Sequence, residues 1–347
     1  MKRNSLLLAT IGIFLCLLSC KKDDLEELAT PAPPPAEIMS VEPKLRSTSL
    51  EIGINGHPLG TRPYTSIPAS EQINLLKQMG MSIYRIDVQS RNNDGRITVP
   101  GLYNPLKKAA DTAGIKLLPV LIPRTLNFKN TEAESYRWGR ALGAKFARRY
   151  RSDFTYYNIA NELDNRCILP FRTGDKESDY NLRRFKIIAA YLKGMNDGIK
   201  AMDPDAKTII NAGWMHYEYL LMLERYGVKF DIVGYQWYDE MEILAALLFN
   251  IHDITTFLSS KFTKPIWFTE FNARDKFGIL DERIQSDFIR NFLEKCQNNP
   301  QVHAAIIYQL FNEPQKFGQE AHYGIFKWLI HYTQYTPKIY ARQALVN

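Results

Sequence analysis

The sequence lacks several features that would assign a chemistry at once. Its 347 residues include only 4 cysteines, and it shows no metal-ligand spacing, no glycine-rich phosphate loop after the first predicted strand and no Schiff-base lysine motif. No metal or other cofactor is therefore expected. Cys167 is predicted to follow a strand and Cys296 to lie late in a helix, beyond disulfide reach even in an oxidising compartment.

Long hydrophobic segments are also scarce. The apolar run at residues 6–18 follows the basic residues Lys2 and Arg3 and is too short to span a bilayer as a mature helix, so it predicts an export signal. It ends at residues 17–20 with the letters LLSC, which resemble the lipobox of bacterial lipoproteins. This resemblance implies cleavage before Cys20 and lipidation of that residue; in an ordinary secretory leader, the alternative, Cys20 would be incidental.

The residues after Cys20 include a proline- and alanine-rich run at 29–36, which cannot build a core and predicts an extended tether. The chain thus divides into a signal peptide at residues 1–19, a lipidated cysteine with its tether at 20–47, and one globular domain at 48–347. The lipobox resemblance implies a protein of the bacterial cell envelope, held at the outer membrane or cell surface only through its lipid.

The charge is moderately basic. The formal net charge of +7 falls to +5 when Lys2 and Arg3 leave with the signal. Basic residues are spread along helical segments such as 137–151, which indicates a solvated helix face; attraction to an acidic polysaccharide or anionic surface is the alternative. No nucleic-acid partner is expected, and no pattern reports the oligomeric state.

From residue 49 onward, short apolar strands alternate with amphipathic helices. The predicted strands cover residues 51–57, 82–87, 116–122, 155–162, 208–214, 230–238, 265–272 and 304–311. The predicted helices cover 70–79 with Ser70 as N-cap and Gly80 as stop, 103–113, 133–150, a long helix ending near 202, 217–226, a helix-rich stretch at 241–258, 281–297, and a terminal segment from 336.

Near-continuous apolar strands, each followed by a helix, are typical of a parallel sheet covered by helices. Eight such units over about 300 residues predict the α/β class and a single-domain (β/α)8 TIM barrel. A doubly wound open sheet is the structural rival, but that fold would favour a phosphate loop after the first strand.

Two of the strands end in a carboxylate. Residues 157–164 read YNIANELD and residues 265–272 read PIWFTEFN, which places Glu162 and Glu270 at the C-terminal face of the barrel. Two facing carboxyl groups suffice to cleave a glycosidic bond, because one protonates the leaving oxygen while the other attacks or stabilises the anomeric carbon. A separation of about 5 to 5.5 Å retains configuration and a wider one inverts it. Spacing along the sequence does not give that distance.

An Asn-Glu pair ending strand four, with a second glutamate ending strand seven of an eightfold barrel, resembles clan A of the retaining glycoside hydrolases, which includes families 5 and 39. The similarity extends from about residue 49 to the C-terminus. It implies that Glu162 is the general acid/base and Glu270 the nucleophile. It also implies that Asn161 holds the sugar 2-hydroxyl, an interaction that strengthens in the transition state.

Further positions match the clan pattern. Arg85, ending strand two, matches the arginine near the nucleophile, where a fixed positive charge keeps that carboxylate ionised; a structural ion pair is the alternative. Gln236, Trp237 and Tyr238 on strand six resemble the His-x-Tyr of family 5, although Gln replaces His, and Tyr238 becomes a candidate hydrogen-bond donor to the nucleophile. Tyr235 is out of phase and is expected to pack between barrel and helix.

Aromatic residues near strand ends are candidate sugar contacts. Trp237, Trp214 and His216 could contact pyranose rings, and a place in the core is the equal alternative for each. His57, after strand one, is a candidate partner of a substrate hydroxyl, with a satisfied loop histidine as the equal alternative.

The end of strand eight departs from the clan pattern. Clan A enzymes often carry a tryptophan there as the floor of the sugar site, whereas residues 309–314 read QLFNEP. The NEP letters look like the acid/base motif of family 5, but Glu313 would act from the eighth strand, so we expect a loop or substrate-contact residue. Asp164, Asp239 and Glu240 are expected to be solvated loop charges, or else to line the cleft.

The clan resemblance implies a hydrolase acting on a β-linked glycan, and the absence of an obvious long insertion over the cleft favours endo action. The glycan and its linkage stay open. A contrasting hypothesis is a non-catalytic glycan-binding barrel at the cell surface, which the presence of both glutamates and Asn161 disfavours. A barrel enzyme of unrelated chemistry is the third, because fold alone does not fix function.

Overall fold

A computed structural model describes residues 50–88, 94–273 and 282–346 of the chain. The chain divides into two units, Met1–Lys44 and Leu45–Asn347, and every described residue belongs to the second. The predicted signal peptide, Cys20 and the tether lie outside the described residues and stay predictions, as does the domain boundary at residue 48.

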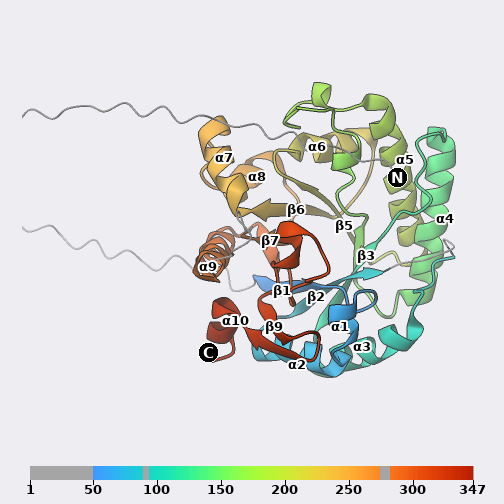
Figure 1. Ribbon diagram of the computed structural model, residues 1–347. Helices are drawn as coiled ribbons and strands as arrows, with labels where there is room; N and C mark the ends of the chain where they lie inside the picture. Colours follow the sequence, from blue (N-terminus) through green and yellow to red (C-terminus); the bar gives the residue numbers. More distant parts are fainter. Residues whose placement is uncertain (1–49, 89–93, 274–281, 347) are drawn as a thin grey trace, which may run out of the picture. The chain divides into compact units, whose positions relative to one another are not determined.

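The parallel strands close into a barrel in the order β1-β2-β3-β4-β5-β6-β7-β8, which confirms the predicted fold (Figure 1). Ile54 of β1 pairs with Ile307 of β8 where the barrel closes. Two strands end earlier than the predicted residues 162 and 311. The bounds are β1 (Glu51–Gly56), β2 (Ile83–Val88), β3 (Lys116–Leu121), β4 (Tyr156–Ile159), β5 (Lys207–Gly213), β6 (Ile232–Tyr238), β7 (Ile266–Asn272) and β8 (Val302–Ile307).

The barrel interior has its own apolar cluster, separate from the larger core that includes buried helix residues. Its buried members come from strands and from no helix, as expected for side chains that point to the barrel axis. Most of them occupy the first half of their strands, so the interior is apolar toward the N-terminal ends of the strands. They are Ile83, Leu118, Ile209, Ile232, Trp267, Ala304 and Ile306.

The helices of the described chain surround the barrel (Figure 1). Their bounds are α1 (Arg62–Thr65), α2 (Ala69–Gln78), α3 (Pro100–Ala113), α4 (Glu132–Tyr150), α5 (Leu182–Met202), α6 (Tyr217–Tyr226), α7 (Asp239–Phe249), α8 (Ile254–Lys261), α9 (Glu282–Asn298) and α10 (Ile339–Ala344). The predicted N-cap at Ser70 is wrong, because α2 begins at Ala69 with Pro68 as its N-cap. Gly114 ends α3 as predicted, with a left-handed φ of 71° that glycine adopts without strain.

Helices α4 and α5 approach each other backbone to backbone. A Cβ atom on Gly139 would lie 2.0 Å from the carbonyl oxygen of Tyr191, and one on Gly143 would lie 2.3 Å from that of Met195. Both distances are far below van der Waals contact, so only glycine fits. The two helices therefore pack against each other at backbone distance.

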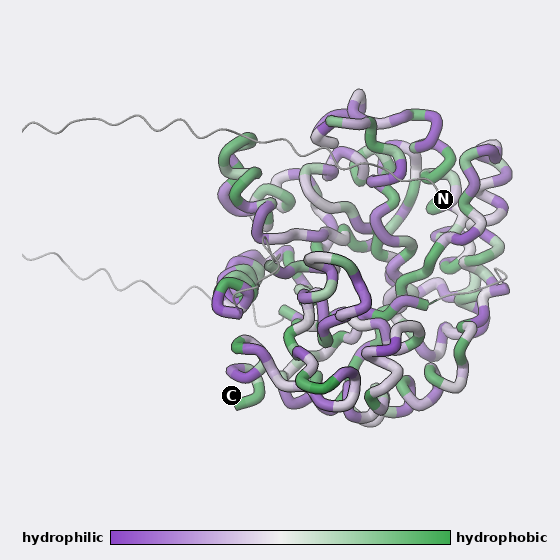
Figure 2. The backbone as a smooth tube through the Cα atoms, viewed as in Figure 1, coloured by the Kyte–Doolittle hydropathy of each residue, from purple (hydrophilic) through white to green (hydrophobic). Residues whose placement is uncertain are grey.

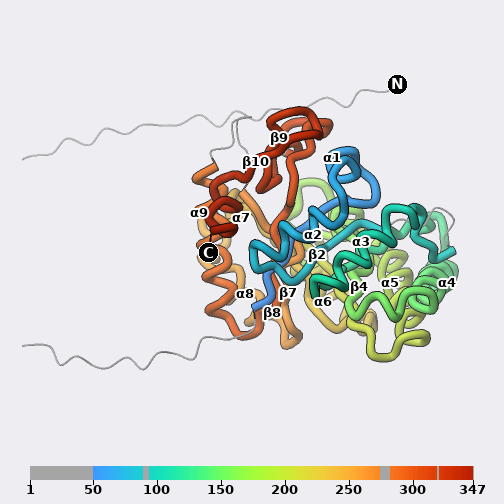
Figure 3. Tube along the Cα trace, turned by 90° about the horizontal axis from the view of Figure 1, so that it is seen from below, coloured from blue at the N-terminus to red at the C-terminus, as the bar shows by residue number. Residues whose placement is uncertain are grey.

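The predicted helix from residue 336 is wrong at its start. Residues up to Pro337 belong to an antiparallel hairpin of β9 (Phe326–Ile330) and β10 (Gln334–Pro337), and α10 begins at Ile339. The hairpin lies beside α1 in two views (Figures 1 and 3). There the Arg62 guanidinium carbon lies 5.8 Å from the centre of the Tyr332 ring.

Helix α7 exposes large apolar side chains, and Figure 2 shows hydrophobic residues along much of it. Ala245 is its only buried residue, whereas Ile243, Leu244, Leu247 and Leu248 are exposed. Of the described helices, none is by itself long and apolar enough to cross a membrane; α7 and α8, bent by 65°, meet the test only as a pair and only by length and composition.

The basic stretch at 137–151 behaves as predicted, because its arginines, among them Arg140 and Arg148, lie on the solvent-exposed side of α4. Cys167 and Cys296 are both buried free thiols. Burial raises the pKa of each thiol, which makes both poor nucleophiles.

Candidate active site

A cavity of about 270 Å³ lies at the C-terminal ends of the strands, and its lining is almost entirely polar or charged. Both predicted glutamates and several predicted substrate-binding residues line it together. The lining residues are Asn55, Gly56, His57, Arg85, Asp87, Asn161, Glu162, Tyr238, Glu270, Tyr308, Lys316 and Glu320.

Arg85 is the hub of this cavity. It lies within β2 and is only 3% exposed. Its Nη1 donates to Glu270 Oε1 at 2.7 Å and to Asn55 Oδ1 at 2.6 Å. Its Nε donates to Asn158 Oδ1 at 2.9 Å, and its Nη2 donates to Asn161 Oδ1 at 2.7 Å. One guanidinium therefore connects the inner ends of β1, β2, β4 and β7, and the predicted pairing with the second glutamate is present.

Glu270 is held through both carboxylate oxygens. Arg85 binds Oε1, and the Tyr238 hydroxyl donates to Oε2 at 3.1 Å, as predicted for that tyrosine. The side chain of Glu270 is buried, with 7% of the residue exposed. A buried carboxylate with fixed donors at both oxygens has a single orientation, with its open side toward the cavity.

A register irregularity turns Glu270 into the barrel. Trp267 belongs to the interior cluster, whereas Phe268 and Phe271 belong to the outer core and contact Phe292 of α9. Strict alternation would send Glu270 outward with Phe268. The register between β6 and β7 shifts after Tyr235, so that an extra residue lets Glu270 face inward. Bulges of this kind often re-aim side chains at active sites.

Asn161 has an amide oxygen surrounded by donors. Arg85 Nη2 lies at 2.7 Å, Asn211 Nδ2 at 2.6 Å and Gln236 Nε2 at 2.9 Å from Asn161 Oδ1. Since Oδ1 is saturated, Asn161 can bind a further hydroxyl only by donating from Nδ2. The arrangement orients Asn161 as a donor at the cavity wall.

Glu162 does not end a strand, because β4 stops at Ile159 and the glutamate follows just after a bend at Asn161. Ala160 has a φ of 75° and Glu162 a φ of 49°, both in the left-handed region that residues with a Cβ rarely adopt. Each of these left-handed backbone conformations costs about 1–3 kcal/mol and persists only when the surrounding structure holds it in place. Glu162 is exposed and lines the same cavity as the buried Glu270.

Four ionisable groups lie together at one side of the cavity: His57, Asp87 and Lys316 line it, and Glu313 lies behind them. His57 Nδ1 lies 3.0 Å from Asp87 Oδ2, and His57 Nε2 lies 3.6 Å from Glu313 Oε2. Lys316 Nζ lies 2.5 Å from the same Glu313 oxygen. His57 therefore lines the cavity, as one of its two sequence hypotheses required, while Glu313 is fully buried behind it rather than at the surface of the site.

The charges of these four groups shift each other's protonation. Burial lowers the pKa of His57, but the hydrogen bond and charge of Asp87, with the charge of Glu313, outweigh it and raise the pKa. Burial raises the pKa of Glu313 and of Asp87, but His57 lowers both, with Lys316 acting on Glu313, and the net pKa of each carboxyl is depressed. Acidic and basic groups therefore alternate here in the order Asp87, His57, Glu313 and Lys316.

Several lining residues were not predicted. Asp87 lies two residues after Arg85 on the same face of β2, so strand alternation was a signal for it. Tyr308 directly follows β8, one residue before the segment 309–314 that departs from the clan pattern. Lys316 and Glu320 lie in the loop after β8, where no sequence pattern marks them.

Other predicted residues lie outside this lining. Trp237 is 1% exposed and belongs to the outer core, and Trp214 packs against Phe249 with ring centres 5.9 Å apart. His216 is buried and contacts a carboxylate behind the site. For these three the structure favours the alternative of a structural residue. Gln236 is also buried and reaches the site only through its bond to Asn161.

Two expectations about loop charges and packing have different outcomes. Asp164 is 0% exposed, so the prediction of a solvated loop charge is wrong for it. Asp239 and Glu240 are half-buried. Tyr235 is fully buried in the outer core, as predicted, and donates its hydroxyl to the carbonyl oxygen of Trp214 at 2.6 Å.

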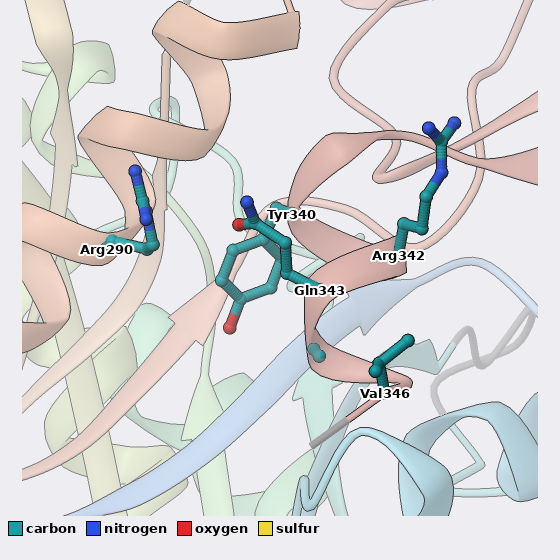
Figure 4. A pocket seen from close by; sticks show the side chains of 6 residues that line it. Arg290, Tyr340, Arg342, Gln343 and Val346 are labelled. Carbon is teal, nitrogen blue, oxygen red and sulfur yellow. The ribbon is translucent and has the colours of Figure 1, made fainter.

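A larger cavity of about 540 Å³ lies elsewhere, between α9 and α10 (Figure 4). None of its lining residues is a carboxylate: they are Arg290, Tyr340, Arg342, Gln343, Ala344 and Val346. Figure 4 shows Arg342 pointing away from Tyr340 and Gln343, so its cationic group does not converge with theirs. Within the described part of the chain, no group of three or more His, Cys, Asp or Glu is placed to hold a metal ion.

No protein-family model matches the sequence, and no curated protein is similar to it in sequence. The structure is similar to the β-glycosidase BGL167, with a TM-score of 0.59 and 14% identity over 88% of this chain and 97% of that one. It is also similar to a family 1 β-glucosidase from Thermotoga maritima, with a TM-score of 0.61 and 12% identity over 86% of this chain and 96% of that one.

A mutant of a hyperthermophilic β-glucosidase gives a TM-score of 0.65 at 10% identity, over 86% of this chain and 99% of that one. At such identities the likeness shows a shared (β/α)8-barrel fold. The more specific resemblance to families 5 and 39 stays a prediction.

Proposed function

We propose that this protein is a retaining glycoside hydrolase that cleaves β-glycosidic bonds by double displacement. The observation that carries the proposal is the cavity lined by both Glu162 and Glu270, in which Arg85 and Tyr238 fix the second carboxylate. The fold shared with β-glycosidases supports it. The two carboxyl groups also differ in environment, since Glu270 is buried and Glu162 exposed.

In the first step Glu270 attacks the anomeric carbon, and Glu162 gives its proton to the leaving oxygen. The glycosidic C–O bond breaks as a new C–O bond forms to Glu270, and the leaving group departs as a neutral alcohol. Arg85 holds Glu270 through Oε1 and Tyr238 through Oε2, so the reacting carboxylate is oriented before substrate binds.

In the second step Glu162, now a carboxylate, removes a proton from water, which attacks the same carbon and releases Glu270. The sugar leaves with the configuration it had in the substrate. Asn161 donates from Nδ2 to the hydroxyl next to the anomeric carbon, because its Oδ1 is occupied by three donors. That contact strengthens as positive charge develops on the ring.

The test is hydrolysis of a panel of plant and microbial β-glycans and aryl β-glycosides, with Glu270→Ala as the control. Release of sugar by the wild type alone supports the proposal, and proton NMR of the first product anomer distinguishes retention from inversion. If wild type and variant release nothing yet both are retained on one immobilised glycan, the protein is a glycan-binding barrel instead.

We also propose that the enzyme acts at the bacterial cell envelope, anchored by a lipid on Cys20. The motif LLSC at residues 17–20 supports this. Metabolic labelling with a radioactive fatty acid should mark the wild type and leave Cys20→Ala unlabelled. Equal labelling of both would contradict the anchor without bearing on catalysis.

A further inference from the structure

A buried hydrogen bond between an aspartate and a histidine lies outside the cavity lining, and the proposed reaction does not use it. Asp164 Oδ2 lies 2.6 Å from His216 Nδ1, with Asp164 0% and His216 6% exposed. Asp164 Oδ2 also accepts from the backbone N–H of Gly213 at 3.4 Å. Because the carboxylate can only accept, His216 Nδ1 carries the proton in this bond. The pair joins the turn after β4 to the segment between β5 and α6.

We propose that the Asp164–His216 pair is a positioning device for Glu162. This rests on the proposed function, in which Glu162 delivers the proton to the leaving group. Glu162 lies two residues before Asp164, in a turn whose φ values of 75° at Ala160 and 49° at Glu162 need support from outside the turn. The pair supplies that support on the C-terminal side of Glu162.

On the N-terminal side of Glu162, the support comes from residues in and around the active site. Asn161 is held at Oδ1 by Arg85, Asn211 and Gln236. The Glu162 N–H lies 3.4 Å from Asn211 Oδ1, a long and weak bond. Glu162 is therefore flanked by two residues with fixed side chains, Asn161 before it and Asp164 two positions after it.

The surroundings show that the pair is built into the fold. A Cβ on Gly174 would lie 2.2 Å from His216 Cδ2, so the loop before α5 packs directly on the imidazole. The Tyr180 ring meets the His216 ring edge-on, with ring centres 6.3 Å apart, and the Tyr180 hydroxyl donates to the Gly174 carbonyl oxygen at 2.7 Å. His216 is itself the residue before α6, whose first turn it joins through a bond from Tyr219 N–H to its carbonyl at 3.1 Å.

If the pair positions Glu162, the loss of activity on removing the pair should depend on the leaving group of the substrate. Without the pair, the turn can relax and move the Glu162 carboxyl away from the leaving oxygen, while Arg85 and Tyr238 still hold Glu270. In His216→Phe, kcat/KM for an aryl β-glycoside with a poor leaving group such as phenol should fall about 10²-fold, the size of loss that a misplacement of about 1 Å can cause. A 2,4-dinitrophenyl glycoside needs no proton, and its kcat/KM should change less than about threefold.

Two further variants separate positioning from general damage. His216→Asn keeps an N–H near the place of Nδ1 and should restore most of the activity toward the phenyl glycoside. Tyr180→Phe removes a buried hydrogen bond from the same cluster without removing a partner of Asp164. It should lower kcat/KM for both substrates by the same factor or leave both unchanged. Should His216→Phe fail to fold, Asp164→Asn is measured with the same two substrates.

The outcomes are distinct. A loss confined to the phenyl glycoside, rescued by His216→Asn, supports the positioning role. An equal loss on both glycosides, or no loss in a folded variant, overturns it while leaving the proposed function intact. A wild type that cleaves no aryl glycoside and no glycan overturns the proposed function, and this inference with it.

Discussion

Replacing Arg85 by methionine tests how much the buried contacts of Arg85 contribute to the stability of the barrel. Methionine fills a similar elongated space but removes the charge and all the donors that bind Glu270, Asn55, Asn158 and Asn161. Glu270 would then be a buried carboxylate without a cation.

Breaking a buried ion pair in this way typically lowers the free energy of unfolding by about 3–5 kcal/mol. Both groups qualify as buried, since Arg85 is 3% and Glu270 7% exposed. For a domain of this size each kcal/mol corresponds to about 2 °C or slightly more, so Arg85→Met should melt about 6–10 °C below the wild type. Adding Glu270→Gln should recover part of the loss, because the uncompensated charge is gone.

Circular dichroism recorded during heating gives the melting temperature of each of these variants. The matched control is Arg225→Met, which also breaks a close carboxylate pair, Arg225 Nη2 to Glu218 Oε1 at 2.6 Å, but on the surface. Its melting temperature should change by about 2 °C or less. If Arg85→Met melts as high as this control, the buried contacts of Arg85 do not stabilise the barrel.

Three smaller predictions concern other contacts. Asn161→Asp should keep the three donors around its oxygen and the wild-type melting temperature, yet lose most hydrolysis, because the Nδ2 donor is gone; full activity would count against that role. The pKa of His57 is raised in the fold above its ordinary 6.5, so its charge stabilises the protein below that pH and the benefit disappears as pH rises through the folded value. Urea titrations should therefore show a flatter alkaline decline for His57→Gln, and an unchanged curve would contradict the pairing with Asp87. Gly139→Ala should lower the melting temperature despite alanine's better helix propensity, since the methyl would meet the Tyr191 carbonyl at 2.0 Å.

The fold was predictable because the barrel repeats a simple pattern. Apolar strands and amphipathic helices alternate along the chain, and parallel strands buried on both faces need no long-range information to be recognised. The hairpin β9–β10 escaped because its strands are short and partly exposed, and because they follow the last repeat. The N-cap of α2 was misplaced by two positions, at Ser70 rather than Pro68, where proline competed with serine.

The site was predictable where side chains follow from strand order. Tyr238 and Glu270 lie near the C-terminal ends of β6 and β7, Glu162 follows β4, and Arg85 lies within β2; the barrel brings all of them to one cavity. Two features depended on information that local patterns do not carry. The bulge that turns Glu270 inward is a property of the pairing of β6 with β7. The burial of Asp164 follows from a contact with His216, 52 residues away in sequence.

The contacts of Arg85 also bear on when the protein acquires activity during its synthesis. Its partners Asn55, Asn158 and Asn161 precede Glu162 in the chain, whereas Glu270 arrives more than a hundred residues later. A nascent chain that ends before β7 would carry the proton donor but no nucleophile, and its guanidinium would lack the carboxylate it binds in the finished barrel. Under the proposed function, no translation product that ends before β7 can hydrolyse a glycan by double displacement. Two separately produced halves divided between β4 and β7 should each be inert and regain hydrolysis only when the barrel reassembles.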